Sequence, residues 1–94
     1  MNPQELTVTH NESAHRFEIK SEDLLAVLDY RLSGKTILFL HTEVPSALEG
    51  RGLGGKLAKA GLEYARVHQL RVQSLCWFVD GYIERHPEYQ DLRA

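Results

Sequence analysis

The 94-residue sequence contains one cysteine and no long apolar run. With Cys76 alone, neither an internal disulfide nor a metal site of several thiolates can form, and a reducing, cytoplasmic setting is expected. The longest apolar run covers residues 75–79, far fewer than a membrane span requires, and the polar N-terminus does not resemble a signal peptide. The five histidines include no pair at the i, i+4 spacing of a helical zinc site. We therefore expect no bound metal and no membrane association.

Positive charge is concentrated in one part of a chain that is acidic overall. The formal net charge is −2, yet residues 51–71 contain five Lys or Arg against one acid. Such a local charge suits a phosphorylated small molecule, whereas nucleic-acid binding, which we do not expect, usually needs a broader basic face. The length and the apolar content of 43% predict a single globular domain over residues 1–94.

The first half of the chain has the alternating pattern of β-strands. The expected strands cover residues 6–10, 15–20, 24–32 and 36–44. Ser33-Gly34 is expected to close the hairpin between the last two strands. Pro45 ends the fourth strand because proline cannot continue a ladder. Together these segments predict an antiparallel meander.

The second half changes to a helical period. A helix is expected from Gly52 to about His68, then a buried strand at 71–75 and a second helix at 77–85. Gly61 lies in the middle of the first helix, where glycine lowers helix stability by about 1 kcal/mol relative to Ala. We attribute the presence of glycine there to close packing of the helix on the sheet. A strand, a helix and a further strand form a right-handed parallel crossover. The predicted fold is α+β, a mixed and mostly antiparallel sheet with one parallel β-α-β crossover and a C-terminal helix.

Four glycines within residues 50–55 are the most informative feature of the chain. They occupy positions 50, 52, 54 and 55, just ahead of the predicted helix. Glycine has no Cβ to hold the backbone N–H groups away from a ligand, so such a turn can surround an anion closely. The helix behind it adds N–H groups and the positive end of its dipole. The turn therefore predicts a phosphate-binding site.

Two common phosphate motifs fit this turn poorly. The spacing G-x-G-x-x-G at residues 50–55 matches a dinucleotide-binding turn, but Leu75 stands where that motif needs an acid for the ribose. Residues 50–56 also approach a nucleoside-triphosphate loop, but Leu57 replaces the hydroxyl that would hold Mg²⁺.

A third pattern fits better. Glu49-x-x-Gly52-x-Gly54 resembles the acyl-CoA pyrophosphate loop of the GCN5-related N-acetyltransferases, Gln/Arg-x-x-Gly-x-Gly/Ala, with Glu49 in place of the usual Gln or Arg. Three further segments resemble a small single-domain subfamily of these enzymes, which has a lone cysteine after the last strand. They are HTEVP at 41–45, CxFV at 76–79 and YIxxHPEY at 82–89. The resemblance covers nearly the whole chain.

The resemblance implies how acyl-CoA would lie. In this family two parallel strands separate at their carboxyl ends, and the acyl-CoA arm enters the gap. Backbone groups of Thr42, Glu43 and Val44 are expected to pair with the pantetheine amides. The N–H groups expected to hold the pyrophosphate belong to Arg51, Gly52, Leu53, Gly54, Gly55 and Lys56. The side chains of Lys56 or Arg51 are candidates for a further phosphate contact, and Arg85 and His86 for the far end of the cofactor.

Acetyl transfer to an amine needs an unprotonated nucleophile, a polarised thioester carbonyl and a proton for the departing thiolate. Glu43, beside the expected thioester, is the candidate general base. Cys76 opens a possible helix, whose dipole favours thiolate, so it is a candidate covalent acyl acceptor or a pocket-lining residue. Tyr82 is a candidate proton donor or a packing residue. Trp77, Phe78 and Tyr82 are expected to close the core.

The leading hypothesis is a small N-acetyltransferase that uses acetyl-CoA and an amine acceptor, which a protein or peptide could carry. The chain ahead of the fourth strand lacks the helices that shape the acceptor pocket in the family, so the acceptor side should be open. One alternative is a CoA-binding or regulatory module without catalysis. Another is a phosphate-ligand binding protein of different chemistry. The sequence leaves acceptor identity and oligomeric state undetermined.

Overall fold

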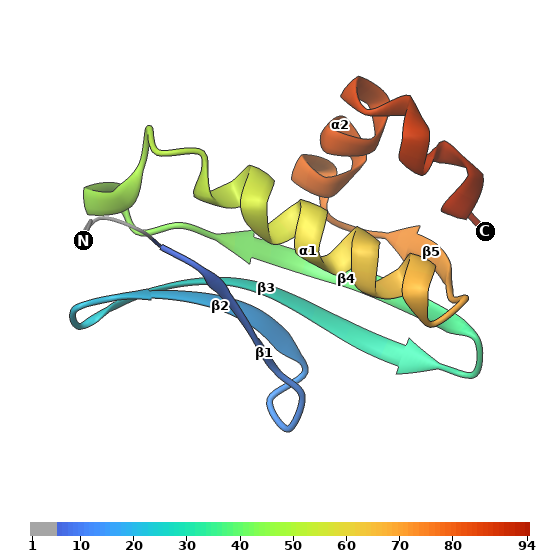
Figure 1. Ribbon diagram of the computed structural model, residues 1–94, viewed down its shortest axis with the longest axis horizontal. Helices are drawn as coiled ribbons and strands as arrows, with labels where there is room; N and C mark the ends of the chain where they lie inside the picture. The colour runs from blue at the N-terminus through green and yellow to red at the C-terminus, as the bar shows by residue number, and fades with distance from the viewer. Residues whose placement is uncertain (1–5) are drawn as a thin grey trace.

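The computed structural model describes residues 6–94 and folds them into one sheet and two α-helices (Figure 1). Residues 1–5 of the polar N-terminus lie outside the described part. The elements in chain order are β1 (Val8–Asn11), β2 (Arg16–Ser21), β3 (Leu24–Ser33), β4 (Thr36–Glu43), the 3-10 helix η1 (Ser46–Leu48), α1 (Leu53–Val67), β5 (Arg71–Ser74), α2 (Trp77–Arg85) and the 3-10 helix η2 (Pro87–Leu92).

The sheet has the predicted mixed topology. Its strand order is β1-β2-β3-β4-β5, with antiparallel pairs up to β4 and a parallel pair between β4 and β5. The predicted α+β fold with one parallel crossover is confirmed. The hairpin turn is Gly34-Lys35 and not Ser33-Gly34, because Ser33 pairs with Thr36. Gly34 has a φ of 58°, a left-handed conformation that glycine adopts without strain.

α1 packs on the sheet through a face of small and apolar residues. Its buried residues are Leu53, Leu57, Ala58, Gly61, Leu62 and Ala65. A Cβ at Gly61 would lie 2.7 Å from the Phe39 ring and 3.2 Å from the Leu28 side chain. The close packing expected at Gly61 is thereby confirmed, since a larger residue would push α1 off the sheet.

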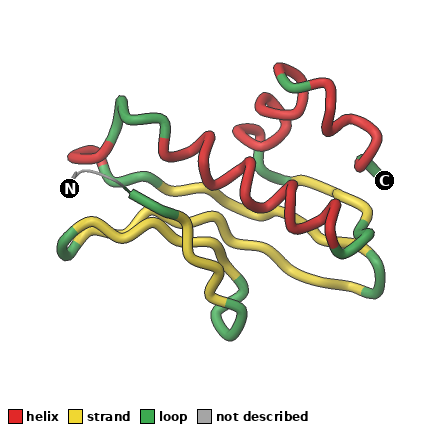
Figure 2. The backbone as a smooth tube through the Cα atoms, viewed as in Figure 1, coloured by secondary structure: helices red, strands yellow, loops and turns green. Residues whose placement is uncertain are grey.

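α2 lies beside α1 on the same side of the sheet (Figures 1 and 2). Val79 and Ile83 are fully buried, and Phe78 and Tyr82 lie against the first turn of α1. Trp77 is 87% exposed, so the expectation that it closes the core is wrong. The buried face of α2 passes through residues 79, 82 and 83, which turns the indole at the start of the helix away from the core.

The 3-10 helix η2 packs against α1 and is bonded to it by side chains. The sequence pattern does not predict this element. The Tyr89 hydroxyl donates to the Glu63 carboxylate at 2.6 Å, and the Arg66 guanidinium donates to both oxygens of Asp91 at 3.1 and 3.2 Å. Burial, together with the bond to Glu63, raises the pKa of Tyr89. The Ala94 N–H donates to the Val72 carbonyl at 2.9 Å, so the last residues also cover part of the outer edge of β5.

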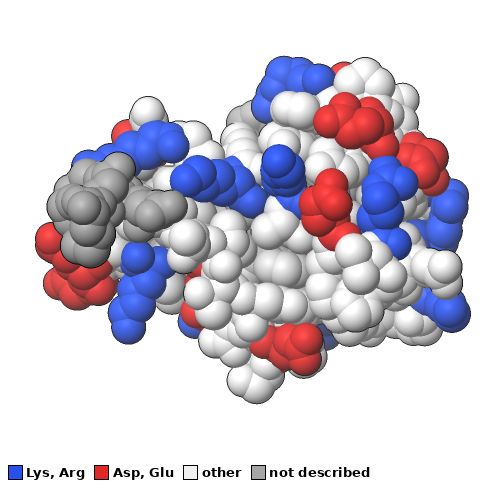
Figure 3. Space-filling model, viewed as in Figure 1, with Lys and Arg blue, Asp and Glu red and all other residues white. Residues whose placement is uncertain are grey.

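The surface carries charges of both signs. On the face seen in Figure 3, Lys and Arg side chains form a broken band across the region of α1, with acidic side chains between and beside them. Within residues 6–94, no helix has the length and apolar character needed to cross a membrane.

Candidate functional site

The two parallel strands separate at their carboxyl ends. Their pairing ends where Phe39 lies opposite Ser74, and the Leu75 N–H donates to the Phe39 carbonyl at 2.8 Å. β4 continues to Glu43 with β3 on one side and, among the described residues, no strand on the other. The gap opens into a cavity of about 740 Å³. Its lining comprises residues 40–44, 48–50, 52–55 and 75–78.

A β-bulge in β4 lies where the cavity begins. Phe39 pairs with Tyr30 and His41 pairs with Asp29, so Leu40 is an extra residue without a partner in β3. A bulge bends its strand and increases the local twist, and this one lies at the point where the pairing of β4 with β5 ends. The sequence gives no signal for it, because residues 37–40 are apolar at every position.

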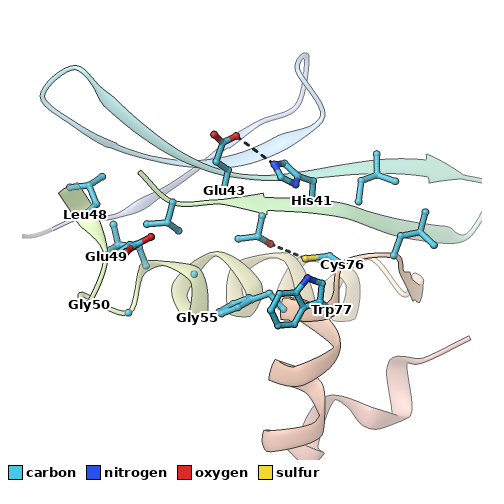
Figure 4. A pocket seen from close by; sticks show the side chains of 16 residues that line it. His41, Glu43, Leu48, Glu49, Gly50, Gly55, Cys76 and Trp77 are labelled. Carbon is cyan, nitrogen blue, oxygen red and sulfur yellow. Dashed lines mark hydrogen bonds and ion pairs between the residues drawn. The ribbon is translucent and has the colours of Figure 1, made fainter. Parts of the chain in front are cut away.

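Successive side chains after the bulge lie on opposite faces of β4. Thr42 is opposite Leu28, which packs against α1, so Thr42 faces the helices. His41 and Glu43 alternate to the other face. Figure 4 shows both of them on the side of β4 away from Cys76 and the glycine turn. The cleft therefore has a helix-side wall and a second wall that carries ionisable groups.

The glycine turn lies at one end of the helix-side wall. Gly50 and Gly52 have φ values of 84° and 73°, which side chains disfavour, and Gly52 has no side chain to cap α1. The Lys56 N–H, which we expected at the pyrophosphate, donates instead to the Gly52 carbonyl at 3.1 Å. The N–H groups of the first turn have no acceptor within the helix. Those of residues 53–55, all of which line the cavity, are thus available to a ligand.

The basic side chains of the turn do not line the cavity. Lys56 and Arg51 are both exposed, and the Lys56 ammonium donates to the Leu6 carbonyl at 3.1 Å. Gly54 has a packing role as well, because a Cβ there would lie 2.7 Å from the Phe78 ring. The acidic Glu49 does line the cavity. Backbone N–H groups are therefore better placed than side chains to receive a phosphate.

Cys76 lies on the helix-side wall, deep in the cleft. Its Sγ is 3.2 Å from Thr42 Oγ1, and the residue is 7% exposed. The Ser74 hydroxyl accepts from the Cys76 N–H at 3.0 Å and donates to the Cys76 carbonyl at 2.9 Å. These bonds fix the start of α2 and hold the thiol beside the separated part of β4.

Comparison with known proteins identifies the family. Residues 16–92 match the family model described as GCN5-related N-acetyl-transferase. The chain belongs to the GCN5-related N-acetyltransferases. The resemblance and the enzyme class expected from the sequence are confirmed, and members of this family use acetyl-CoA as cosubstrate.

Relatives of this acetyltransferase chain are similar over most of their length. Protein NATD1 of Mus musculus is 35% identical over 85 residues, which cover 87% of this chain and 77% of that protein. Protein NATD1 of Danio rerio is 32% identical over 89 residues, which cover 89% of this chain and 81% of that protein. The NMR solution structure of a GCN5-like protein from Staphylococcus aureus is 32% identical, with a TM-score of 0.74, and the match covers 100% of this chain and 91% of that one.

The second wall of the acetyltransferase cleft carries Glu43, the predicted base, and His41. The Nε2 atom of His41 is 3.5 Å from a carboxylate oxygen of Glu43, and both side chains are exposed. His41 is not among the site residues predicted from the sequence. Its i, i+2 spacing from Glu43 is the signal that identifies it, because alternate residues of a strand share a face.

The structure brings together most, but not all, of the predicted site residues. Thr42, Glu43, Val44, Gly52, Leu53, Gly54, Gly55 and Cys76 line the cavity. Tyr82, Arg85 and His86 do not. The Tyr82 ring stacks on His86 with centroids 3.8 Å apart and lies against Gly55, and burial raises the pKa of Tyr82. Among residues 6–94, no three His, Cys, Asp or Glu side chains are grouped to hold a metal ion.

Proposed function

We propose that the protein transfers an acetyl group from acetyl-CoA to an amine, with the acyl-CoA arm lying between β4 and β5. One observation supports this most: the cleft formed where the strands separate has the glycine turn at one end and Thr42 and Cys76 deep within it. A linear molecule with a diphosphate at one end and a thioester at the other matches that arrangement.

The diphosphate is bound by the main chain in this proposal. The N–H groups of residues 53–55 donate to its oxygens, and the positive end of α1 adds to the attraction. Backbone groups of residues 42–44 bond the pantetheine amides, since β5 no longer occupies that edge of β4. Arg51 and Lys56 add positive charge at the rim.

Transfer proceeds by attack of a neutral amine on the thioester carbonyl carbon. The amine approaches from the face that carries His41 and Glu43, and its proton passes to the Glu43 carboxylate, directly or through water. A backbone N–H of the separated part of β4 donates to the developing oxyanion. As the carbon–nitrogen bond forms and the carbon–sulfur bond breaks, CoA leaves as a thiolate and takes up a proton. Holding both substrates in one cleft supplies much of the rate.

Cys76 offers a second route. Its thiolate could attack the same carbonyl, release CoA and pass the acetyl group to the amine from a thioester on Sγ. Replacing Cys76 with Ala separates the two routes, because only the covalent one needs the sulfur. We favour direct attack, since the Cys76 thiol is engaged with Thr42 on the wall away from Glu43. Tyr82 is outside the cavity lining, so water serves as the proton donor to the thiolate in this scheme.

The acceptor side is open, which suits an amine on a protein or peptide. Among the described residues, no helix covers the face that carries His41 and Glu43. The same openness favours the second candidate function, a CoA-binding or regulatory module without catalysis. The cytoplasmic location and the single-domain extent over residues 1–94 remain predictions.

Calorimetric titration with acetyl-CoA, followed by a thiol-release assay with a panel of amines and peptides, tests the proposal. We expect binding of one acetyl-CoA, turnover with at least one acceptor, and a loss of about 10²-fold in kcat for Glu43→Gln. Binding without turnover on any acceptor would favour the regulatory module. No binding of acetyl-CoA would contradict both.

A further inference from the structure

Trp77 is a large apolar side chain that lies exposed in the wall of the cleft. It is 87% exposed and lines the cavity together with Leu75, which is 72% exposed. Burying an indole contributes more apolar area than burying almost any other side chain, so leaving one in water beside a binding site indicates that the ligand covers it.

The position of Trp77 follows from its two neighbours in sequence. Cys76 points inward to Thr42, and Phe78 fills the space above Gly54 at the start of α1. The indole between them is directed into the cleft opening. Figure 4 shows it beside Cys76, on the same side of β4 as Gly55 and the glycine turn.

This position lies on the path of the pantetheine arm. In the proposed function, the diphosphate lies on residues 53–55 and the thioester lies near Thr42 and Cys76, so the arm must cross the stretch of cleft wall that starts α2. The side chains there are apolar, with Leu53, Trp77 and Phe78 all lining the cavity. The arm carries methyl and methylene groups that can pack on such a surface.

We infer that the Trp77 indole packs on the pantetheine arm of bound acyl-CoA and covers it from solvent, an inference that rests on the proposed function. The contact selects ligands that carry the arm over adenine nucleotides that lack it. The main-chain bonds along β4 and the glycine turn recognise amide and phosphate groups, whereas the indole recognises the apolar part between them.

The emission of Trp77 tests this directly, because it is the only tryptophan of the chain. Coenzyme A should shift that emission to shorter wavelength as the indole leaves water, and pantetheine at higher concentration should give the same shift. ADP carries the adenine and the diphosphate without the arm, so it should leave the emission unchanged. Calorimetry with coenzyme A should show about tenfold weaker binding for Trp77→Ala and near-normal binding for Trp77→Phe.

Matched controls separate this inference from the proposed function. Val67 is also largely exposed, at 74%, but it does not line the cavity. The Val67→Ala variant should therefore bind coenzyme A normally. Normal calorimetric binding with unchanged Trp77 emission, or unaltered affinity in Trp77→Ala, would overturn the inference and leave the proposed function standing. A full shift with ADP, or an indole already buried by self-association without ligand, would also overturn it. No binding of coenzyme A to the parent protein would overturn both.

Discussion

At the scale of single residues, His10 shows how a half-buried titratable group packs among aromatic rings beside the core. Its ring stacks on Phe17 with centroids 4.1 Å apart, meets Tyr64 edge-on, and is hydrogen-bonded to the Tyr30 hydroxyl at 2.7 Å. Burial lowers the pKa of His10, an effect that Glu12 opposes and His68 reinforces. The folded protein therefore favours the neutral imidazole.

Stability should consequently fall as the pH drops below about 6.5, the ordinary pKa of histidine. The unfolded chain takes up a proton there that folded His10 resists, so the loss continues down to the lower folded pKa. One proton limits this contribution to about 1.4 kcal/mol per pH unit. Urea denaturation between about pH 7.5 and about pH 5.5 measures it, with His10→Gln as the comparison. Parallel pH profiles for the two proteins would contradict the assignment to His10.

Gly61 and Gly55 form a matched pair within α1. Gly61→Ala places a methyl group 2.7 Å from Phe39, so unfolding experiments should show a loss of about 1–3 kcal/mol. Gly55→Ala meets only Tyr82, at 3.6 Å, and should be neutral or stabilising by up to about 1 kcal/mol. Equal effects of the two substitutions would show that α1 does not approach the sheet as closely as described.

At the scale of elements, the bulge and the glycine turn shape the two ends of the cleft. Deleting Leu40 should leave Thr42 opposite Leu28 but remove the bend that separates β4 from β5. We expect a folded protein by circular dichroism whose affinity for coenzyme A falls at least about tenfold. Retained affinity would mean that the strands separate without help from the bulge.

The glycine turn can be probed at Gly55, since Gly54 also accommodates the Phe78 ring. Gly55→Asp adds a negative charge in the first turn of α1, where it stabilises a helix but repels a phosphate. Gly55→Asn has nearly the same shape without the charge. Calorimetry with coenzyme A should show the Asp variant at least about tenfold weaker than the Asn variant. Equal affinities would place the diphosphate elsewhere.

The two α-helices and the strands could be predicted within about two residues because their hydrophobic periods are local. The glycine turn and the position of Cys76 after the last strand also follow from sequence pattern. The placement of His41 beside Glu43 follows from their i, i+2 spacing in one strand. The bulge at Leu40 and the exposure of Trp77 could not be predicted. Each depends on the register between β3 and β4 or on which face of α2 meets α1, and neither is encoded in a short window.

At the scale of the whole molecule, the helices cover one side of the sheet and leave the other open. α1, α2 and η2 pack together on the side that holds the glycine turn and Cys76, while His41 and Glu43 lie on the opposite face (Figures 1 and 4). The cleft between β4 and β5 joins the two sides. A nucleotide cosubstrate can therefore bind from the helical side while an acceptor amine approaches from the open face.

The most direct test of this account is an NMR titration of the ¹⁵N-labelled protein with coenzyme A. We predict that the amide resonances that shift most belong to residues 50–55, followed by residues 40–44 and 75–78. Two results would contradict a cofactor held in this cleft. One is a set of shifts concentrated instead at the groove lined by Val72, Gln73 and Arg93. The other is the absence of any amide shift at a coenzyme A concentration that saturates calorimetric binding.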